Sequence, residues 1–461
     1  MPAHGLLRDT SQMMPTRCPS KGKNEGRDES KRHRVCLAYH LVPSDSVSVG
    51  SVHPALLLCF VLLLFPALVW ATACAAQSER TSQFLLVNRT AAVSRESFQE
   101  VKCALPDVPG ARIRIGVGYI FSYFRRPDDA SLLASLRHVL ELAQESDTPV
   151  LIQIDGEQWW ESRPDLWNWW DPSLRGFDPA NRENVEWSGW KPEHALKIAW
   201  RNWGRQLRVP PPPNLMSPRY REACHEKMAF VIPVVLEWWK ALPAEKKELL
   251  VGIKVGWESS VGVNAWYYPN GNALLDRPAS EDPTSGLNGE APPARGVAPI
   301  GYAAVKTAGL RDTGEVTEAD LAQIARRHLE DLSREAARLG VPRDRLFTHG
   351  AGWKDGELLY RAAVNPHSCP GWSFYRHAAD PRKDLGVQEA LKHSDAPWWS
   401  ATEWFYPGPR EVEPWRQALE NTLTDKRCRY LCLYNWEGVR GSEPILEAIR
   451  QTVAASANPQ P

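Results

Sequence analysis

Two glutamates, each at the C-terminal end of an apolar, strand-like run, are the residues most suited to chemistry. Glu258 closes the run LLVGIKVGWE, and Glu403 closes the run APWWSATE. In a β/α barrel these runs would be the fourth and seventh strands, whose C-terminal ends form the catalytic face. Two carboxyl groups that face each other across such a mouth suit the hydrolysis of a glycosidic bond, with Glu258 as acid/base and Glu403 as nucleophile.

The elements that must position these glutamates alternate between strand-like and helical patterns. Helical patterns separate most of the strand candidates, and eight βα units in order are typical of an α/β fold of the (β/α)8 type, a TIM barrel. We expect this barrel to span residues 110–455. The eight strand candidates are residues 112–119, 149–155, 196–201, 249–258, 346–350, 371–377, 397–403 and 429–436.

The first four strand candidates also show an alternation of apolar with small or polar residues. In 150–155, for example, VLIQID alternates in this way, and the period of two places each set on one face. We expect the apolar set to pack outward against the helices, which directs Asp155, Arg201 and Glu258 into the barrel at the strand tips. Lys254 also points inward, as a Schiff-base aldolase would need, but it lies four residues before its strand tip. A half-solvated antiparallel sheet has the same period, and the intervening helices argue against it.

Two segments are too long to be mere connections. Residues 156–194 follow the second strand candidate, and residues 259–316 follow the fourth. Both leave C-terminal strand ends, where a barrel builds its substrate site. The chain has 21 tryptophans, several of them clustered in the first of these loops. Because flat, amphipathic indoles suit stacking on pyranose rings, a carbohydrate substrate is expected, with some tryptophans lining a groove and others in the core.

The arrangement resembles the clan-A (β/α)8 retaining glycoside hydrolases over roughly residues 110–455. The motifs that carry the resemblance are Gly256-Trp257-Glu258 and Ala401-Thr402-Glu403-Trp404. The resemblance implies an acid/base glutamate after strand four and a nucleophile after strand seven, here Glu258 and Glu403.

One position departs from that family. The family usually has Asn directly before the acid/base glutamate, where it contacts the sugar 2-hydroxyl, and this chain has Trp257. Asn264 or Asn202 would have to take over that contact. Trp436, on the eighth strand candidate, looks like the aromatic floor that such enzymes place under the sugar.

Asp155-Gly156-Glu157 supports an alternative mechanism. A strand-end Asp-x-Glu is similar to the catalytic pair of substrate-assisted hexosaminidases and hyaluronidases, in which the Glu is the acid and the Asp orients the acetamido group of the substrate. Otherwise Asp155, Glu157 and Trp159 are substrate-binding residues. Five further strand-end polar residues are candidates to hydrogen-bond sugar hydroxyls: Arg201, Asn202, His349, His377 and Asn435.

A third interpretation is a non-catalytic carbohydrate-binding barrel, with the tryptophan-rich loops as its surface. Composition narrows the other classes. Lys+Arg and Asp+Glu both number 55, so no net positive charge favours nucleic acid as a partner. No His/Cys cluster has the spacing of a zinc site, and no phosphate- or dinucleotide-binding motif stands in a supporting context. We therefore predict neither a metal nor a cofactor.

The N-terminal part of the chain predicts export. Residues 1–52 are polar and charged without periodicity, as in a disordered extension or a misassigned start. Residues 53–77 contain the apolar run 54–76, followed by small residues, which is typical of a cleaved signal peptide, an uncleaved membrane anchor or a lipoprotein signal. Each alternative places the rest outside the cytoplasm, whether secreted, periplasmic or attached to a membrane. Residues 78–109 are expected to be a linker.

Overall fold

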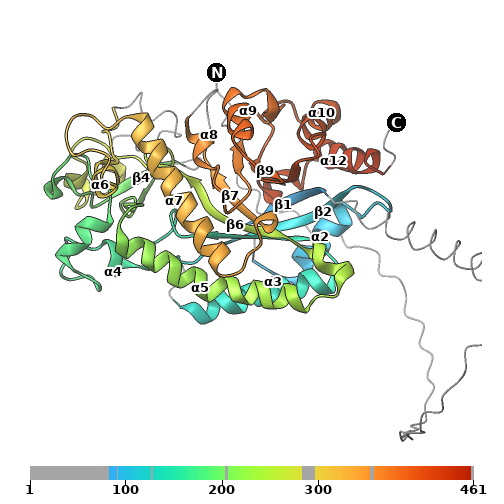
Figure 1. The fold of residues 1–461 in the computed structure, drawn as a ribbon, viewed down its shortest axis with the longest axis horizontal. Coiled ribbons are helices and arrows are strands. Elements are labelled where there is room, and N and C mark those ends of the chain that lie inside the picture. The colour runs from blue at the N-terminus through green and yellow to red at the C-terminus, as the bar shows by residue number, and fades with distance from the viewer. Residues whose placement is uncertain are drawn as a thin grey trace, which may run out of the picture. The chain divides into compact units, whose positions relative to one another are not determined.

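The computed structural model describes residues 83–90, 92–125, 128–202, 206–282, 296–352 and 358–457. Eight parallel strands close into a barrel with helices between them, which confirms the (β/α)8 prediction (Figure 1). In chain order the barrel strands are β1 (Gln83–Arg89), β2 (Ile113–Ser122), β3 (Val150–Asp155), β6 (Leu250–Ser259), β7 (Leu346–Gly350), β8 (Gly371–Phe374), β9 (Trp399–Trp404) and β10 (Cys428–Leu433).

Two strand predictions were wrong: the first barrel strand was missed, and one candidate is not a barrel strand. The first strand is β1, which lies in the segment expected to be a linker and pairs with both β2 and β10. The candidate 196–201 is not a barrel strand. Its end forms β4 (Ala199–Asn202), which pairs antiparallel with β5 (Gln206–Val209) in a separate hairpin. The two errors cancel, so β6 and β9 are still the fourth and seventh strands.

Helices cover the outside of the barrel. Figure 1 shows α3, α5 and α7 along one flank and α9, α10 and α12 along another. The longer helices are α2 (Arg95–Ala104), α3 (Asp129–Glu145), α5 (Pro218–Ala241), α7 (Glu318–Arg338), α9 (Leu385–Lys392), α10 (Val412–Leu423) and α12 (Glu443–Ala455). The shorter ones are α4 (Pro164–Trp167), α6 (Tyr302–Thr307), α8 (Leu358–Ala362) and α11 (Trp436–Val439).

Local sequence signals fix where the main helices begin. α7 starts with a capping box, in which Thr317 accepts from the backbone of Asp320 and Asp320 accepts from the backbone of Thr317. α5 starts at Pro218, and the hydroxyl of Ser217 accepts from the backbone N–H of Tyr220. These caps satisfy N–H groups that a helix N-terminus leaves without partners.

The expected alternation inside the barrel strands is present. Val150, Ile152 and Ile154 pack outward in the large core shared with the helices, whereas Leu151 belongs to a separate cluster inside the barrel. Above that inner cluster the interior becomes polar. Gln153 donates a 2.8 Å hydrogen bond to Asn88 there, so both side chains are satisfied although they are almost fully buried.

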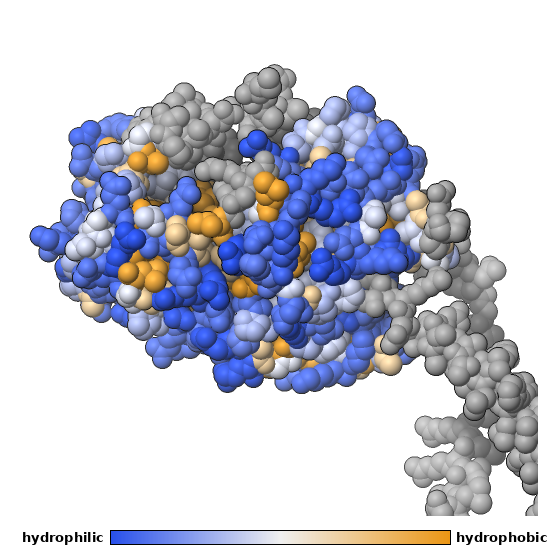
Figure 2. Space-filling view, turned by 45° about the horizontal axis from the view of Figure 1, so that its top comes forward, coloured by the Kyte–Doolittle hydropathy of each residue, from blue (hydrophilic) through white to orange (hydrophobic). Residues whose placement is uncertain are grey.

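The two long insertions pack against each other and follow the third and fourth barrel strands, rather than the second and fourth. Trp190 in the first insertion donates a 2.7 Å hydrogen bond to the backbone of Gly314 in the second. The side chain of Asn214, which lies between the first insertion and α5, donates a 2.9 Å hydrogen bond to the hydroxyl of Thr307, and the backbones of Trp200 and Trp266 form an antiparallel β-bridge. Each described tryptophan is buried or half-buried, and the face shown in Figure 2 is mostly hydrophilic with small, separate apolar patches.

The predicted N-terminal extension and the apolar run 54–76 lie outside the described residues. Within the part of the chain that the structure does describe, no helix combines the length and the apolar character needed to cross a bilayer. Export and membrane attachment therefore stay predictions.

Candidate active site

Glu258 and Glu403 stand at the C-terminal ends of β6 and β9. The backbone of β6 bends as it reaches the barrel mouth. Gly256 and Glu258 have φ values of 77° and 48°, and the pairing of β6 with β7 shifts its register between Val255 and Ser259. Bulges of this kind re-aim side chains, and non-glycine residues with positive φ cluster at functional sites. The distortion at Glu258 thus marks the place where the strand departs from simple alternation.

The two carboxyl groups lie close together in a buried setting. One carboxylate oxygen of Glu258 and one of Glu403 are within 4.8 Å of each other. Their residues are only 4 % and 7 % exposed. Burial and the charge of Glu258 raise the pKa of Glu403 to about 8, and burial also raises the pKa of Glu258. The pair therefore binds a proton more tightly than an isolated carboxyl group does, because two close, buried carboxyl groups resist ionising together.

Each carboxyl group has its own hydrogen-bond donors. Tyr375, just after β8, donates its hydroxyl proton to Glu403, and the side chain of Trp257 also hydrogen-bonds to Glu403. Asn264 donates to Glu258 Oε2 at 2.9 Å. Trp257 is the residue that stands where the similar family has Asn, and Asn264 is one of the two candidates to replace that Asn. In this structure Asn264 contacts the carboxyl group of Glu258.

Below the pair lies a buried polar chain inside the barrel. Lys254 on β6 is fully buried, and its Nζ lies 3.1 Å from Nδ1 of His349 on β7. The other ring nitrogen of His349 lies 2.8 Å from the hydroxyl of Ser373 on β8. His349 was expected to bind sugar, but it is fully buried and both of its nitrogens face protein groups. It supports the floor of the site.

Asp155 and Glu157 form a second acidic pair, at the end of β3. Asp155 accepts from the backbone N–H of Glu157 at 2.8 Å, and burial together with the charge of Glu157 raises the pKa of Asp155 to about 6. Oε1 of Glu157 accepts from the hydroxyl of Ser259 at 2.6 Å and lies 3.0 Å from Nε2 of His328 on α7. The carboxylate of Glu157 is thus anchored between β6 and an outer helix.

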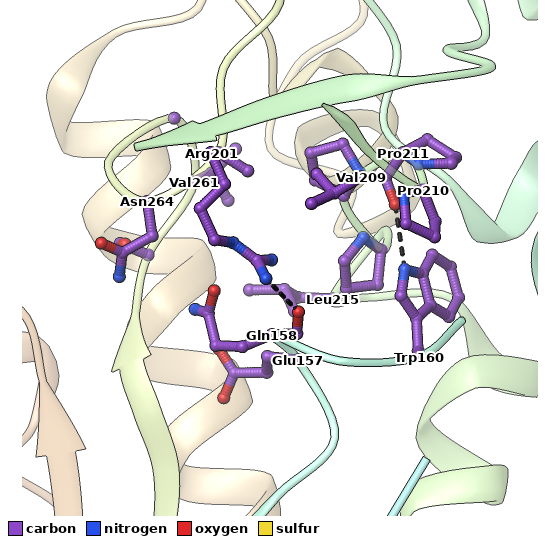
Figure 3. A pocket seen from close by; sticks show the side chains of 15 residues that line it. Glu157, Gln158, Trp160, Arg201, Val209, Pro210, Pro211, Leu215, Val261 and Asn264 are labelled. Carbon is purple, nitrogen blue, oxygen red and sulfur yellow. Dashed lines mark hydrogen bonds between the residues drawn. The ribbon is translucent and has the colours of Figure 1, made fainter. Parts of the chain in front are cut away.

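A pocket next to the second acidic pair is lined by two of the predicted binding residues, Glu157 and Arg201. Arg201, Gln158 and Asn264 line it together with a run of prolines, and Figure 3 shows Arg201 reaching toward the backbone of Gln158, to which it donates a hydrogen bond. The guanidinium of Arg201 lies over the ring of Trp159 at 5.1 Å. Burial lowers the pKa of Arg201 to about 10, so the group is charged at neutral pH. The side chain of Asn202 lies outside the described residues.

Trp436 does not occupy the position expected from the sequence. It begins α11 instead of lying on the last barrel strand, and it is fully buried in the hydrophobic core. Tyr434, the residue directly after β10, is the aromatic residue that this strand end brings near the pair. It is half-buried, its ring meets that of Tyr375 at 6.2 Å, and burial and the charges of both glutamates raise its pKa. No sequence signal distinguished Tyr434 or Tyr375 from other aromatic residues near strand ends.

The donor set of the site favours a carboxyl pair over a metal centre. Glu258, His349 and Glu403 each offer one ligand-type atom within 4.8 Å of the others. However, one nitrogen of His349 faces Lys254 and the other faces Ser373. A cation bound there would also lie beside the ammonium of Lys254, and like charges repel strongly in a buried site.

Comparisons with known proteins add little to this geometry. No family model matches the chain, and no curated protein sequence matches it. Among solved structures the chain is similar to the YdhT protein from Bacillus subtilis, with a TM-score of 0.39 and 8 % identity over 82 % of this chain and 84 % of that one. A GH5-4 broad specificity endoglucanase from an uncultured bacterium gives a TM-score of 0.39 and 10 % identity over 83 % and 95 %.

A third similar structure is GH26A from Muricauda sp. MAR_2010_75, with a TM-score of 0.37 and 11 % identity over 81 % of this chain and 89 % of that one. TM-scores and identities this low carry no argument about function. The functional case therefore rests on the barrel and on the residues at its mouth.

Proposed function

We propose that this protein hydrolyses O-glycosidic bonds in an oligo- or polysaccharide by a retaining, two-glutamate mechanism. The observation that carries the proposal is the separation of the two carboxyl groups. Retaining glycosidases hold theirs about 5 Å apart, whereas inverting ones leave roughly 6.5–9.5 Å for a water molecule. Glu258 and Glu403 have oxygens within 4.8 Å, at the ends of the fourth and seventh strands.

In the first step a carboxylate oxygen of Glu403 attacks the anomeric carbon and forms a C–O bond with it. The bond from that carbon to the leaving oxygen breaks, and Glu258 gives its proton to that oxygen. In the second step Glu258 takes a proton from water, the resulting oxygen attacks the anomeric carbon, and the bond to Glu403 breaks. The first step requires Glu403 to be ionised while Glu258 carries the proton, so the proposal needs bound substrate to favour that arrangement of the proton in the pair.

The surroundings support this division of roles. Tyr375 and Trp257 both donate to Glu403, and donors of this kind stabilise a carboxylate that must act as nucleophile and later leave. Arg201, which lines the neighbouring pocket and is charged at neutral pH, would hydrogen-bond sugar hydroxyls, and Trp159 supports its guanidinium from below. With the apolar run 54–76 read as an export signal, the substrate would be met outside the cytoplasm.

The substrate-assisted alternative is less well supported by the geometry. A general acid must lie within hydrogen-bond reach of the glycosidic oxygen. Glu157 instead turns toward Ser259 and His328, between β6 and α7. The same contacts give Glu157 a structural role, because they tie the third strand end to the fourth and to an outer helix.

Turnover of a panel of aryl glycosides by the protein and its Glu258→Gln and Glu403→Gln variants tests the proposal. We expect cleavage of at least one member, and a loss of about 10²- to 10⁴-fold or more in each variant. Glu186→Gln is a matched control, because Glu186 is fully buried but lies in the first insertion. Cleavage that survives both site changes would refute the assignment. Glycan binding without cleavage would favour the carbohydrate-binding barrel.

A further inference from the structure

Lys254 is a buried cation that the two-glutamate mechanism does not use. It lies on β6, on the same strand as Glu258 and four residues before it, and its side chain is fully buried inside the barrel. An unpaired charge in such a place costs several kcal/mol or neutralises itself. A lysine therefore persists there only if its surroundings hold the charge.

The groups that face Lys254 come from the strands around it and are mostly acidic. His349 on β7 lies at 3.1 Å, and the ring of Trp257 lies 5.5 Å from Nζ. Burial lowers the pKa of Lys254 to about 8, and acidic neighbours act in the opposite direction. The titratable groups that act on its charge or are acted on by it are Asp155 and Glu157 at β3, Glu258 on its own strand, His349 on β7, Glu403 on β9 and Cys432 on β10.

The contact with His349 fixes the direction of a hydrogen-bond chain. An ammonium group can only donate, so Nδ1 of His349 accepts from Lys254. The ring is then neutral with its proton on Nε2, in agreement with burial and the charge of Lys254, which hold the pKa of His349 well below its usual value. Nε2 therefore donates to the hydroxyl of Ser373 at 2.8 Å.

Ser373 passes this polarity on to the pair. Because its oxygen accepts from His349, its own proton is free to point elsewhere. A ring nitrogen of His349 lies within 4.8 Å of a carboxylate oxygen of each glutamate. The Ser373 hydroxyl lowers the pKa of Glu258, and the charge of Lys254 lowers the pKa of both glutamates. The donors in the chain thus run in one direction, from the buried cation to the catalytic carboxyl groups.

We propose that Lys254 is the fixed counter-cation of the glutamate pair. Through its own charge, and through His349 and Ser373, it keeps one of the two carboxyl groups ionised at neutral pH. The effect of Lys254 on catalysis rests on the proposed function, whereas its effect on the charge of the pair does not. Lys254 acts as a positioning residue, since it holds the charge state of Glu258 and Glu403 without touching the sugar.

The charge state is measured directly, without substrate, by the infrared band of protonated carboxyl groups at pH 7. The difference between the protein and its Glu258→Gln and Glu403→Gln variants gives the part of the band that belongs to the pair. We expect one protonated carboxyl group in the pair of the parent protein, and close to two in Lys254→Met and Lys254→Gln. Lys254→Arg keeps the charge and should retain the parent band. An unchanged band in both neutral variants would overturn the proposal.

The pH dependence of kcat/KM gives the second readout. In the neutral variants the acidic limb should move up by at least about one pH unit, which is tenfold in rate below the limb. Lys254→Arg keeps the positive charge, so its acidic limb should stay at the position of the parent protein. A purely structural role of Lys254 would not predict this difference between Arg and the neutral residues. Ser373→Ala removes a single buried hydroxyl and tests the chain if the lysine variants do not fold. In Ser373→Ala we expect a smaller shift of the same sign. The absence of any shift would exclude a role for the hydrogen bonds from Lys254 through His349 and Ser373.

The two readouts separate this inference from the proposed function. An infrared change without glycosidase activity in the parent would support the counter-cation and refute the hydrolase. Activity with an unchanged band and unchanged pH limbs in the variants would support the hydrolase and refute the counter-cation.

Discussion

Glu258 and Glu403 bring carboxylate oxygens within 4.8 Å of each other although their strands, β6 and β9, are not neighbours in the barrel. Only the closure of the sheet makes this contact. The register shift in β6 and the positive φ of Glu258 accompany it. Because the two groups are this close, the charge of each one affects the titration of the other.

Azide should distinguish the roles of the two glutamates. In Glu403→Ala the small anion can fill the space of the lost carboxylate and attack from its side, which gives a glycosyl azide of inverted configuration. In Glu258→Ala, with an activated leaving group, azide should instead attack the glycosyl-enzyme and give retained configuration. Nuclear magnetic resonance of the product reads the configuration. The opposite pattern would exchange the two roles.

Tyr375→Phe should slow catalysis and move its acidic limb. Burial and the charge of Glu258 raise the pKa of Glu403 to about 8, and the Tyr375 hydroxyl lowers it. Without that donor the pKa rises further, so the ionised nucleophile appears only at higher pH. A hydrogen bond to a charged group contributes about 1.5–3 kcal/mol, which corresponds to roughly 10- to 150-fold in kcat.

Tyr434→Phe is the control for that measurement. Its ring faces Tyr375, and its removal takes away a similar hydroxyl near the pair. We expect the acidic limb of Tyr434→Phe to stay within a few tenths of a pH unit of the parent, on the usual scale of small electrostatic changes. Equal shifts in the two variants would show that the Tyr375–Glu403 hydrogen bond has no special role.

Asn264→Ala should act on the other limb. Asn264 donates to Glu258 Oε2 and lowers the pKa of that group, which burial raises. Loss of the donor therefore raises the pKa of Glu258, and the protonated acid persists to higher pH. We expect the alkaline limb of kcat to move up, with a decrease in kcat of about fivefold for one hydrogen bond. A shift to lower pH would contradict the assignment of Glu258 as acid.

The fold was predictable from the sequence because most barrel strands are short apolar runs bounded by helical patterns. β1 was missed for a physical reason. Its seven residues are all buried, so FLLV reads as a continuous apolar run without alternation, as parallel strands often do. The alternating run 196–201 reads as a strand and is one in part, but its partner β5 was not foreseen. Alternation identifies a pleated segment and says nothing about which sheet it joins.

The site was predictable only where a strand end fixes the side chain. Glu258 and Glu403 follow from strand order, because the C-terminal ends of barrel strands converge. Tyr375 and Tyr434 depend on how the chain turns after β8 and β10, and the contact of Asn264 depends on the insertion after β6. Trp436 was misplaced because the eighth strand ends at Leu433 and a helix follows. A period-two pattern does not predict such turns.

Glu157→Gln should leave most of the catalytic activity intact. The carboxylate accepts from Ser259 and lies 3.0 Å from His328, and Gln keeps an acceptor for the first contact. We expect kcat/KM within about tenfold of the parent on neutral aryl glycosides, with a loss of thermal stability from the weakened anchor. A loss of activity as large as that of Glu258→Gln, seen only with N-acetylated substrates, would establish the substrate-assisted mechanism instead.

Glu186 should make the folded protein less stable as the pH rises. It is fully buried, and burial raises its pKa to about 8, against the smaller opposing effect of backbone amides near the start of α6. An unfolded Glu titrates near 4.5. Between these values the folded chain keeps a proton that the unfolded chain has lost. The free energy of unfolding therefore falls with pH in this window, by about 1.4 kcal/mol per unit and at most about 5 kcal/mol in total.

Glu186→Gln cannot titrate, so the difference in unfolding free energy between this variant and the parent should change with pH. Urea unfolding at pH 5, 6.5 and 8 measures this difference from about 3 units below the folded pKa up to that pKa. Relative to the parent, the variant should gain stability at each step upward. Glu237→Gln, an exposed change on α5, should give a constant difference. A constant difference for Glu186→Gln as well would mean that Glu186 is ionised in the folded protein, held by the amide groups at the start of α6.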